Sequence, residues 1–390
     1  KFRDQFITDV IQGGAGTSMN MNMNEVIANR ANEILGGELG KYDRCHPNDH
    51  VNYGQSTNDV VPTAGKLTVQ LLIKDLLTDL QYLYDTLQAK GNEFDHVIKM
   101  GRTHLQDAVP IRLGQEFRAF SQPVLRDIKR ISAAVEELTY VNMGATAVGT
   151  GINADVEYVK NVVRILSEVT GFEFKQSPDL VDGTRNLDSF VWLSSALKTC
   201  AVNLSKTAND IRLMASGPKA GLAEILLPQQ QPGSSIMPGK VNPVIPEVLN
   251  QVCFQIFGND ITITKAAEAG QLELNVFEPV LFFNLFQSIE ILKNGIITFI
   301  ENCLKGITAQ EENCKYWVDR SVGIITALNP HIGYKNAAEI AKESIKTGVP
   351  VAQIVLQRGL LSKEDLDVIL NPFEMTKPGI PGKALLKKNK

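Results

Sequence analysis

The sequence has little of what membrane and nucleic-acid-binding proteins depend on. Its longest apolar runs are interrupted by Lys, Asn or Glu, so we expect no segment that crosses a bilayer. Charge of one sign is not in excess, because 39 basic and 43 acidic residues are mixed along the chain and the net charge is -4. Such a balance does not attract a polyanion. We therefore expect neither a membrane nor a nucleic acid as partner.

Cysteine and histidine are scarce as well, with five of each. The odd number of cysteines and the absence of C-x-x-C spacing argue against a disulfide framework, and a reducing cytoplasm fits best. His46 and His50 are four residues apart, but Pro47 disfavours a helix there and no third ligand is near. The sequence therefore predicts no metal site.

The chain of 390 residues is long enough for several helical layers around one large core. It begins with lysine at residue 1, so we expect a further segment to precede it. The lack of a signal peptide therefore says little about location.

Apolar residues recur at steps of three and four over most of the chain, which predicts long helices. We expect Asn58 and Asp59 to cap the helix that contains Val69–Leu87, and Pro123 to kink or end the helix that contains Phe117–Leu138. Shorter helical patterns after Gly306 predict a small C-terminal helical domain. The stripes cover Val69–Leu87, Phe117–Leu138, Leu187–Ile211, a segment starting near Pro243, and Val276–Phe299, and the shorter patterns cover Ala337–Lys346, Val351–Arg358 and Lys363–Leu370.

Five long helices in series indicate a mainly α protein built on an elongated helical bundle. Their stripes are broad, and helices of this length expose much apolar surface unless several chains associate. We therefore expect a homo-oligomer.

Five polar loops that contain glycine separate these helices, and their residue types suit a substrate with two carboxylates. The first, residues 13–18, offers the Thr17 hydroxyl, although by itself a helix-entry turn explains it as well. The second, residues 46–59, places Ser56, Thr57 and Asn58 before a helix N-terminus, which attracts anions. For Asp59 we prefer a capping role.

The third loop, residues 99–107, contains Thr103 and His104, and an ion pair between Arg102 and Asp107 would explain its charges. A lone histidine is usually structural, so only the company of the other loops makes His104 a candidate. The fourth, residues 144–153, is small and flexible and means little alone.

The fifth loop, residues 233–243, has Ser234 and Ser235 shortly before Lys240. A cation beside hydroxyl groups can bind a carboxylate and also lower the free energy of a serine alkoxide. The glycine and lysine spacing excludes a phosphate-binding P-loop, and a mobile surface loop is the ordinary alternative.

The Gly-Ser-Ser-Ile-Met-Pro-Gly-Lys-Val-Asn-Pro segment at residues 233–243 resembles the signature of the aspartase/fumarase superfamily. Four further stretches, residues 47–52, 55–59, 143–151 and 267–276, are more similar to its ammonia-lyase (aspartase) branch. Class II fumarases typically have Ser-Ser-Asn-Asp at residues 56–59 and Gly-Gly-Thr-Ala at residues 144–147, and this chain has neither.

The resemblance implies a homotetramer with a shared central bundle, in which loops of three subunits form each active site. It implies a truncated N-terminal domain at residues 1–58, a central helix bundle at 59–305 and a small C-terminal helical domain at 306–390. The chemistry would need no cofactor, and the resemblance is compatible with activation by a divalent cation such as Mg²⁺.

The resemblance also implies the reaction, which is the reversible deamination of L-aspartate to fumarate and ammonia by anti elimination through an aci-carboxylate. Ser234 is chosen as base over Ser235 on the resemblance alone, with Ser235 as a binding residue. The other implied site residues are Ser56, Thr57 and Thr103 for the reacting carboxylate, Lys240 and Asn242 for the other one, and Thr17, Asn58 and His104 around the amine.

Glu247 either orients His104 or is a surface residue in the first turn of a helix. Two rival functions remain open on the sequence: a class II fumarate hydratase that uses almost the same loops, and a catalytically silent structural homologue.

Overall fold

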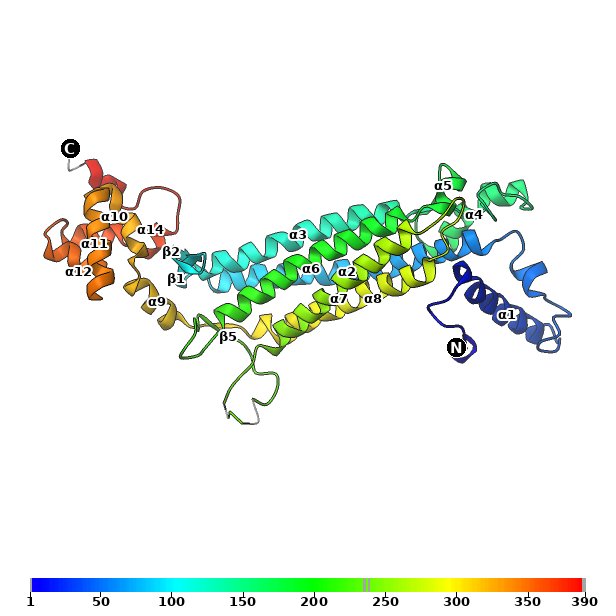
Figure 1. The fold of residues 1–390 in the computed structure, drawn as a ribbon, viewed down its shortest axis with the longest axis horizontal. Coiled ribbons are helices and arrows are strands. Elements are labelled where there is room, and N and C mark those ends of the chain that lie inside the picture. Colours follow the sequence, from blue (N-terminus) through cyan, green and yellow to red (C-terminus); the bar gives the residue numbers. More distant parts are fainter. Residues whose placement is uncertain (1, 234–235, 238, 388–390) are drawn as a thin grey trace. The chain divides into compact units, whose positions relative to one another are not determined.

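The computed structural model describes residues 2–233, 236–237 and 239–387. Helices make up most of this part of the chain (Figure 1), so the predicted mainly α fold is confirmed. The helices are α1 (Thr17–Ile34), α2 (Thr57–Glu93), α3 (Leu113–Glu137), α4 (Val156–Thr170), α5 (Leu180–Arg185), α6 (Asp188–Met214), α7 (Val244–Glu268), α8 (Glu278–Asn302), α9 (Glu311–Arg320), α10 (Ile325–Ile332), α11 (Tyr334–Thr347), α12 (Val351–Gln357), α13 (Lys363–Ile369) and α14 (Pro372–Met375).

Strands are short and pair in twos. They are β1 (Ile98–Thr103), β2 (Gln106–Arg112), β3 (Tyr140–Val141), β4 (Lys175–Gln176), β5 (Ile225–Leu226) and β6 (Thr308–Ala309). The pairs β1–β2 and β5–β6 are antiparallel, and β3–β4 is parallel.

The chain forms two compact units, and the long helices contribute a segment to each. The first unit comprises Lys1–Gln81, Val124–Ser205 and Val248–Ile297, and the second comprises Tyr82–Pro123, Lys206–Glu247 and Thr298–Lys390. The division at residues 58 and 305 stays a prediction.

In the first unit, segments of α2, α3, α6, α7 and α8 run side by side as a helical bundle (Figure 1). Leu76, Ile131 and Leu292 are completely buried, as the apolar stripes predicted. Phe190 and Phe282 pack edge to face with ring centroids 5.3 Å apart. The five predicted long helices are therefore all present, because their apolar periodicity matches the faces they bury.

The start of α2 differs from the expectation. The N-cap is Ser56, whose Oγ accepts from the Asn58 N–H at 3.1 Å, and the Ser56 N–H in turn donates to Asp59 Oδ1 at 3.0 Å. This reciprocal pattern is a capping box. Asn58 is therefore not the cap, whereas Asp59 does take part in capping. Pro123 also differs in part, because α3 continues through it.

The second unit contains the β1–β2 hairpin and the small C-terminal helices. Met100 of β1 shares a buried core with Leu328, Ile340, Ile354 and other apolar residues of α10 to α13. The three short helices predicted after residue 306 correspond to α11, α12 and α13.

One helical segment of the described chain, Glu278–Gly306, is long and apolar enough to cross a membrane by length and composition. The expectation that no apolar run would be long enough is therefore wrong on those two criteria. The core helix of a bundle meets the same criteria, and this segment supplies Ile289, Leu292 and Ile296 to the buried core. The segment is weak evidence for a membrane role.

Candidate active site

The predicted donors before α2 meet in the first unit. Ser56, Thr57 and Asn58 are half-buried, and the capping box holds their backbone in one conformation. The Asn58 side-chain amide donates to the Ala147 carbonyl at 2.7 Å, which ties the N-terminus of α2 to the loop at residues 144–151. Two of the predicted loops therefore lie together, although 89 residues separate this donor and acceptor.

Asp59 holds the same two loops through hydrogen bonds to the backbone of each. Its carboxylate is fully buried and accepts from the backbone N–H of Ser56 at 3.0 Å and of Thr146 at 2.9 Å. Burial raises the pKa of Asp59 to about 6, against the lowering effect of these hydrogen bonds. A group that the sequence assigned to capping alone therefore also determines where the fourth loop lies.

The first predicted loop, residues 13–18, leads into α1, and α1 contacts the start of α2 through Asn20 and Thr57. Gly14, Ala15 and Gly16 all have positive φ, at 75°, 58° and 85°, and the Thr17 Oγ1 donates to the Gly14 carbonyl at 2.7 Å. The exposed Thr17 hydroxyl thus lies at the turn that begins α1. Ala15, unlike its two neighbours, is not glycine, and its positive φ is a conformation that residues with a side chain rarely adopt.

Asn20 and Asn24 are functional candidates that the sequence reasoning did not select. Both are buried on α1, and the Asn20 Nδ2 donates to Thr57 Oγ1 at 3.1 Å. The Asn24 Nδ2 donates to Asn52 Oδ1 at 3.1 Å. Their spacing of four on a helix was the available signal, because it places both amides on one face.

Thr103 and His104 lie at the tip of the β1–β2 hairpin in the second unit, and both are exposed. The expected loop is therefore a hairpin with a two-residue turn, in which His104 has φ 55° and Leu105 has φ 60°. Two positive φ values are typical of a type I′ turn, which usually takes Asn or Gly. Non-glycine residues in this conformation store strain, which often accompanies a functional role.

The expected ion pair between Arg102 and Asp107 is wrong. Arg102 pairs with the buried carboxylate of Glu224, and Asp107 accepts from Ser321 Oγ at 2.7 Å. Arg102 and Asp107 are cross-strand neighbours in the hairpin, but each finds a partner outside it.

Lys240 and Asn242 line a cavity of about 480 Å³ in the second unit, together with Pro243 and residues of the 215–227 segment. The Lys240 N–H donates to the Met237 carbonyl at 3.2 Å. The Gly233 Cα lies so close to the Lys240 carbonyl that a Cβ there would clash, which requires glycine. Ser234 and Ser235 lie outside the described residues.

Glu247 occupies the first turn of α7, 3.7 Å from Arg212, and both side chains are partly exposed. Its proposed partner His104 lies on the hairpin turn. The pairing of the two therefore stays a prediction, as do the other site roles.

Among the described residues, no group of three or more His, Cys, Asp or Glu side chains could hold a metal ion. The side chains of His46 and His50 accept hydrogen bonds from nearby backbone N–H groups. The His50 Nδ1 accepts from the His46 N–H at 2.8 Å, and the His46 Nδ1 accepts from the N–H groups of Asn48 and Asp49 at 3.3 Å.

Residues 1–258 match the family model described as "Lyase", and residues 324–377 match "Fumarase C C-terminus". The chain belongs to the aspartase/fumarase superfamily of lyases. The resemblance that residues 233–243 indicated is thereby confirmed, and the enzyme belongs to the ammonia-lyase branch, to judge from its relatives.

Those relatives cover nearly the whole chain. An aspartate ammonia-lyase of Bacillus subtilis (strain 168) is 60% identical over 388 residues, which is 100% of this chain and 82% of that protein. One from Helicobacter pylori (strain ATCC 700392 / 26695) is 52% identical over 97% of this chain and 81% of that protein. One from Escherichia coli (strain K12) is 49% identical over 98% of this chain and 80% of that protein.

Solved structures agree in fold. A fumarate lyase:delta crystallin from Brucella melitensis, bound to cobalt, has a TM-score of 0.94 and 49% identity, covering 96% of this chain and 81% of that chain. A class II fumarase from Schistosoma mansoni has a TM-score of 0.89 but only 36% identity, covering 96% and 82%. The bundle fold is thus common to both branches, and sequence distinguishes them.

Proposed function

We propose that the enzyme catalyses the reversible deamination of L-aspartate to fumarate and ammonia. The observation that carries this proposal is full-length identity of 49–60% to proteins named aspartate ammonia-lyase. The placement of the donors is consistent with a dicarboxylate, since one set surrounds the N-terminus of α2 and the other lines the Lys240 cavity.

The elimination removes a weakly acidic proton from Cβ of the substrate, next to its side-chain carboxylate. Negative charge then spreads onto this carboxylate as an aci form, and donors that are already oriented stabilise it best. We assign this task to Ser56, Thr57 and Thr103. The ordered capping box at Ser56 supports the assignment, because such donors need little reorganisation.

The remaining groups would bind the other ends of the substrate. Lys240 and Asn242 would hold the second carboxylate, and Thr17, Asn58 and His104 would surround the departing amine. We propose Ser234 as the base that takes the Cβ proton, with Ser235 as a binding residue. A serine alkoxide requires exclusion of water, and the glycines at 233 and 239 allow loop closure.

Glu247, in the first turn of α7, would orient His104 across the site. If it does not, Glu247 is a surface residue whose negative charge stabilises the N-terminus of that helix. Replacement of Glu247 by Gln, with kcat measured against pH, separates the two roles.

We propose a homotetramer in which each active site takes loops from three subunits. The first unit exposes large apolar side chains on α6 and α7, including Trp192 (44%), Val202 (52%), Phe254 (57%) and Ile261 (66%). Exposed apolar surface of this kind is typical of an interface. The candidate donors are also distributed over both compact units, and Thr17, Thr103 and His104 are exposed on the single chain.

The chemistry as proposed uses protein groups alone and needs no cofactor, and activation by a divalent cation such as Mg²⁺ at another site is part of the proposal. We also propose a cytoplasmic location, for which buried free cysteines at 200, 253, 303 and 314 are supporting evidence. The division into residues 1–58, 59–305 and 306–390 completes the proposal.

Ultraviolet absorbance of fumarate tests the reaction directly. Purified enzyme supplied with L-aspartate should produce fumarate, whereas L-malate should produce little or none. Formation of fumarate from malate but not from aspartate would instead identify a fumarate hydratase. A folded oligomer that turns over neither substrate would indicate a silent homologue.

A further inference from the structure

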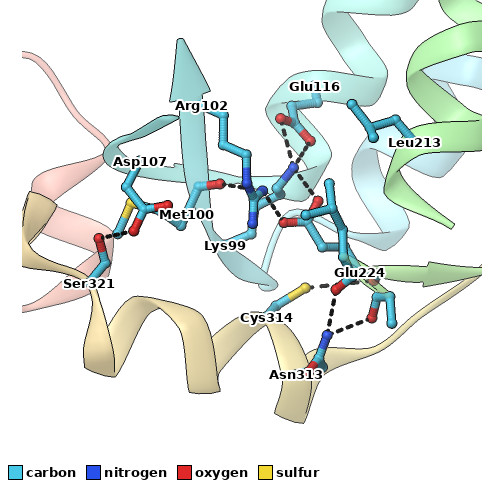
Figure 2. Close-up of polar contacts among 12 residues, drawn as sticks. Lys99, Met100, Arg102, Asp107, Glu116, Leu213, Glu224, Asn313, Cys314 and Ser321 are labelled. Carbon is cyan, nitrogen blue, oxygen red and sulfur yellow. Dashed lines mark hydrogen bonds and ion pairs between the residues drawn. The ribbon is translucent and has the colours of Figure 1, made fainter. Parts of the chain in front are cut away.

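Buried polar networks occur in both units, and they differ in charge. In the second unit the buried carboxylate of Glu224 pairs with Lys99 and Arg102, and opposite charges compensate each other there (Figure 2). The network in the first unit consists of neutral asparagine amides and ends on the hydroxyl of Thr57, one of the donors assigned to the reacting carboxylate. The orientation of its donors and acceptors therefore decides what the Thr57 hydroxyl can do.

The direction of this amide network is fixed at a backbone carbonyl. Asn52 Nδ2 lies 3.3 Å from the carbonyl oxygen of Gln55. A carbonyl oxygen only accepts, so the NH₂ group of Asn52 must face it, and the Asn52 side-chain oxygen is left for α1. This oxygen accepts from Asn24 Nδ2 at 3.1 Å and from Asn20 Nδ2 at 3.4 Å. Both asparagines of α1 therefore present their NH₂ groups at this point.

The same NH₂ group of Asn20 reaches Thr57. Asn20 Nδ2 donates to Thr57 Oγ1 at 3.1 Å, and Asn20 Oδ1 accepts from Asn24 Nδ2 at 3.3 Å. An amide NH₂ group only donates, so the Thr57 hydroxyl cannot give its proton to Asn20. Among the described residues of the chain, no other side chain bonds to this hydroxyl. Thr57 is half-buried, and its proton is therefore available to a substrate.

We propose that Asn20 is a positioning residue that makes the Thr57 hydroxyl a donor to the reacting carboxylate. This inference rests on the proposed function, in which Thr57 stabilises the aci form. The charge on that carboxylate grows as the proton leaves Cβ, so a hydroxyl that donates to it stabilises the transition state more than the ground state. The N–H of Asn20 also polarises the O–H bond of Thr57, because hydrogen bonds in a chain strengthen one another.

Asn20→Leu tests the proposal, because leucine has a similar volume and neither donates nor accepts. Asn24→Leu is the matched control: it removes the same amide from the same face of α1, but Asn24 donates to Asn52 and Asn20 and not to Thr57. Each variant is measured for kcat with L-aspartate and for the Kd of two ligands by calorimetry. Succinate carries the carboxylate of the ground state, whereas 3-nitropropionate, supplied as its nitronate, resembles the aci form in shape and charge.

We expect Asn20→Leu to lower kcat and to raise the nitronate Kd by about tenfold each, which is the range of one hydrogen bond. The succinate Kd should rise by less than about threefold, because the hydroxyl donates more strongly to the more highly charged ligand. Asn24→Leu should change all three quantities by less than about threefold. Equal changes in the two Kd values, or equal effects of the two variants, would overturn the proposal.

Thr57→Val provides a second measurement, because valine removes the hydroxyl and keeps the shape of the side chain. In this background Asn20→Leu has no hydroxyl left to orient, so it should change kcat by less than about twofold. A merely structural role of Asn20 would lower kcat by the same factor in both backgrounds. That result would contradict the inference.

If Asn20→Leu does not fold, Asn20→Asp replaces it, because the shape stays and the introduced carboxylate accepts the Thr57 proton itself. The introduced charge repels the nitronate in any case, so the rise in its Kd should be larger with Thr57 present than in the Thr57→Val background. Equal rises would refute the inference.

The ligands also separate this inference from the proposed function. Wild-type enzyme that binds both ligands but does not deaminate aspartate would refute the proposed function alone, and the two Kd values would still decide the role of Asn20. Wild-type enzyme that binds neither ligand would overturn both.

Discussion

Replacement of Asp59 by Asn tests how the buried carboxylate holds the donors at the start of α2. The wild-type carboxylate accepts from two backbone N–H groups, those of Ser56 and Thr146. Asparagine has the same shape but only one acceptor oxygen, and its NH₂ group faces the second N–H. A buried N–H without a partner costs about 1–3 kcal/mol.

The effect should depend on pH. Burial raises the pKa of Asp59 to about 6, so the carboxyl is ionised above that pH and protonated below it. Protonated Asp59, like Asn, has lost one acceptor. Protonation nevertheless stabilises the folded protein, because burial penalises the charged carboxylate more than the two hydrogen bonds favour it. This contribution to the free energy of unfolding is fully present below pH 3.8 and is lost as the pH rises through about 6.

The assay is the KM for L-aspartate of wild type and Asp59→Asn between pH 5 and 8.5. At pH 8 we expect the KM of the variant to be about tenfold higher, which corresponds to about 1.4 kcal/mol for one lost N–H acceptor. Near pH 5 the ratio of the two KM values should approach one.

Asp75→Asn is the matched control, because Asp75 is an exposed aspartate on the same helix. Its KM should equal that of wild type at every pH. A ratio for Asp59→Asn that is near one at pH 8, or that stays constant from pH 5 to 8.5, would refute the positioning of the Ser56 and Thr146 backbone by this carboxylate.

Three further predictions concern the base, a buried carboxyl and the interface. Ser234→Ala should lower kcat by about 10²- to 10⁴-fold with an unchanged circular dichroism spectrum, and near-normal turnover would exclude Ser234 as base. Glu278 is buried and its pKa is raised to about 8, so its stabilising contribution is complete below pH 4.5 and lost as the pH rises through 8. The thermal midpoint of Glu278→Gln should therefore vary less than that of wild type between pH 5 and 8, and parallel curves would contradict this. Ile261→Glu introduces a charge at an apolar position that is 66% exposed, and light scattering should show smaller species than in wild type, whereas an unchanged mass would remove Ile261 from the interface.

Local patterns predicted most of the helices. The stripe from Leu187 to Ile211 became α6, and the segment near Pro243 became α7, because a helix buries every third or fourth residue and this periodicity is visible in sequence. The capping box at Ser56 was misassigned by two residues, although its members were identified. The β1–β2 hairpin was missed, since its turn is formed by His104 and Leu105 and not by glycine or asparagine.

For the candidate site too, some residues were predictable from the sequence and others were not. Sequence alone selected the Ser234, Thr103 and Lys240 segments, because their residue types and a family signature are local properties. It did not select Asn20, whose bond to Thr57 spans 37 residues, nor Glu224, which meets Arg102 across 122 residues. The partners of Asp59 and Arg102 likewise depended on tertiary structure.

The sequence by itself therefore determined the fold class, the polar loops and the chemical type of the groups in them. Only the tertiary structure decided which of those groups are held, and by what: Thr57 by Asn20, the Ser56 and Thr146 backbone by Asp59, and the hairpin by Glu224. The physical reason is the range of the forces. Helix periodicity and capping act within a few residues, whereas a buried charge finds its counter-charge wherever the fold brings one.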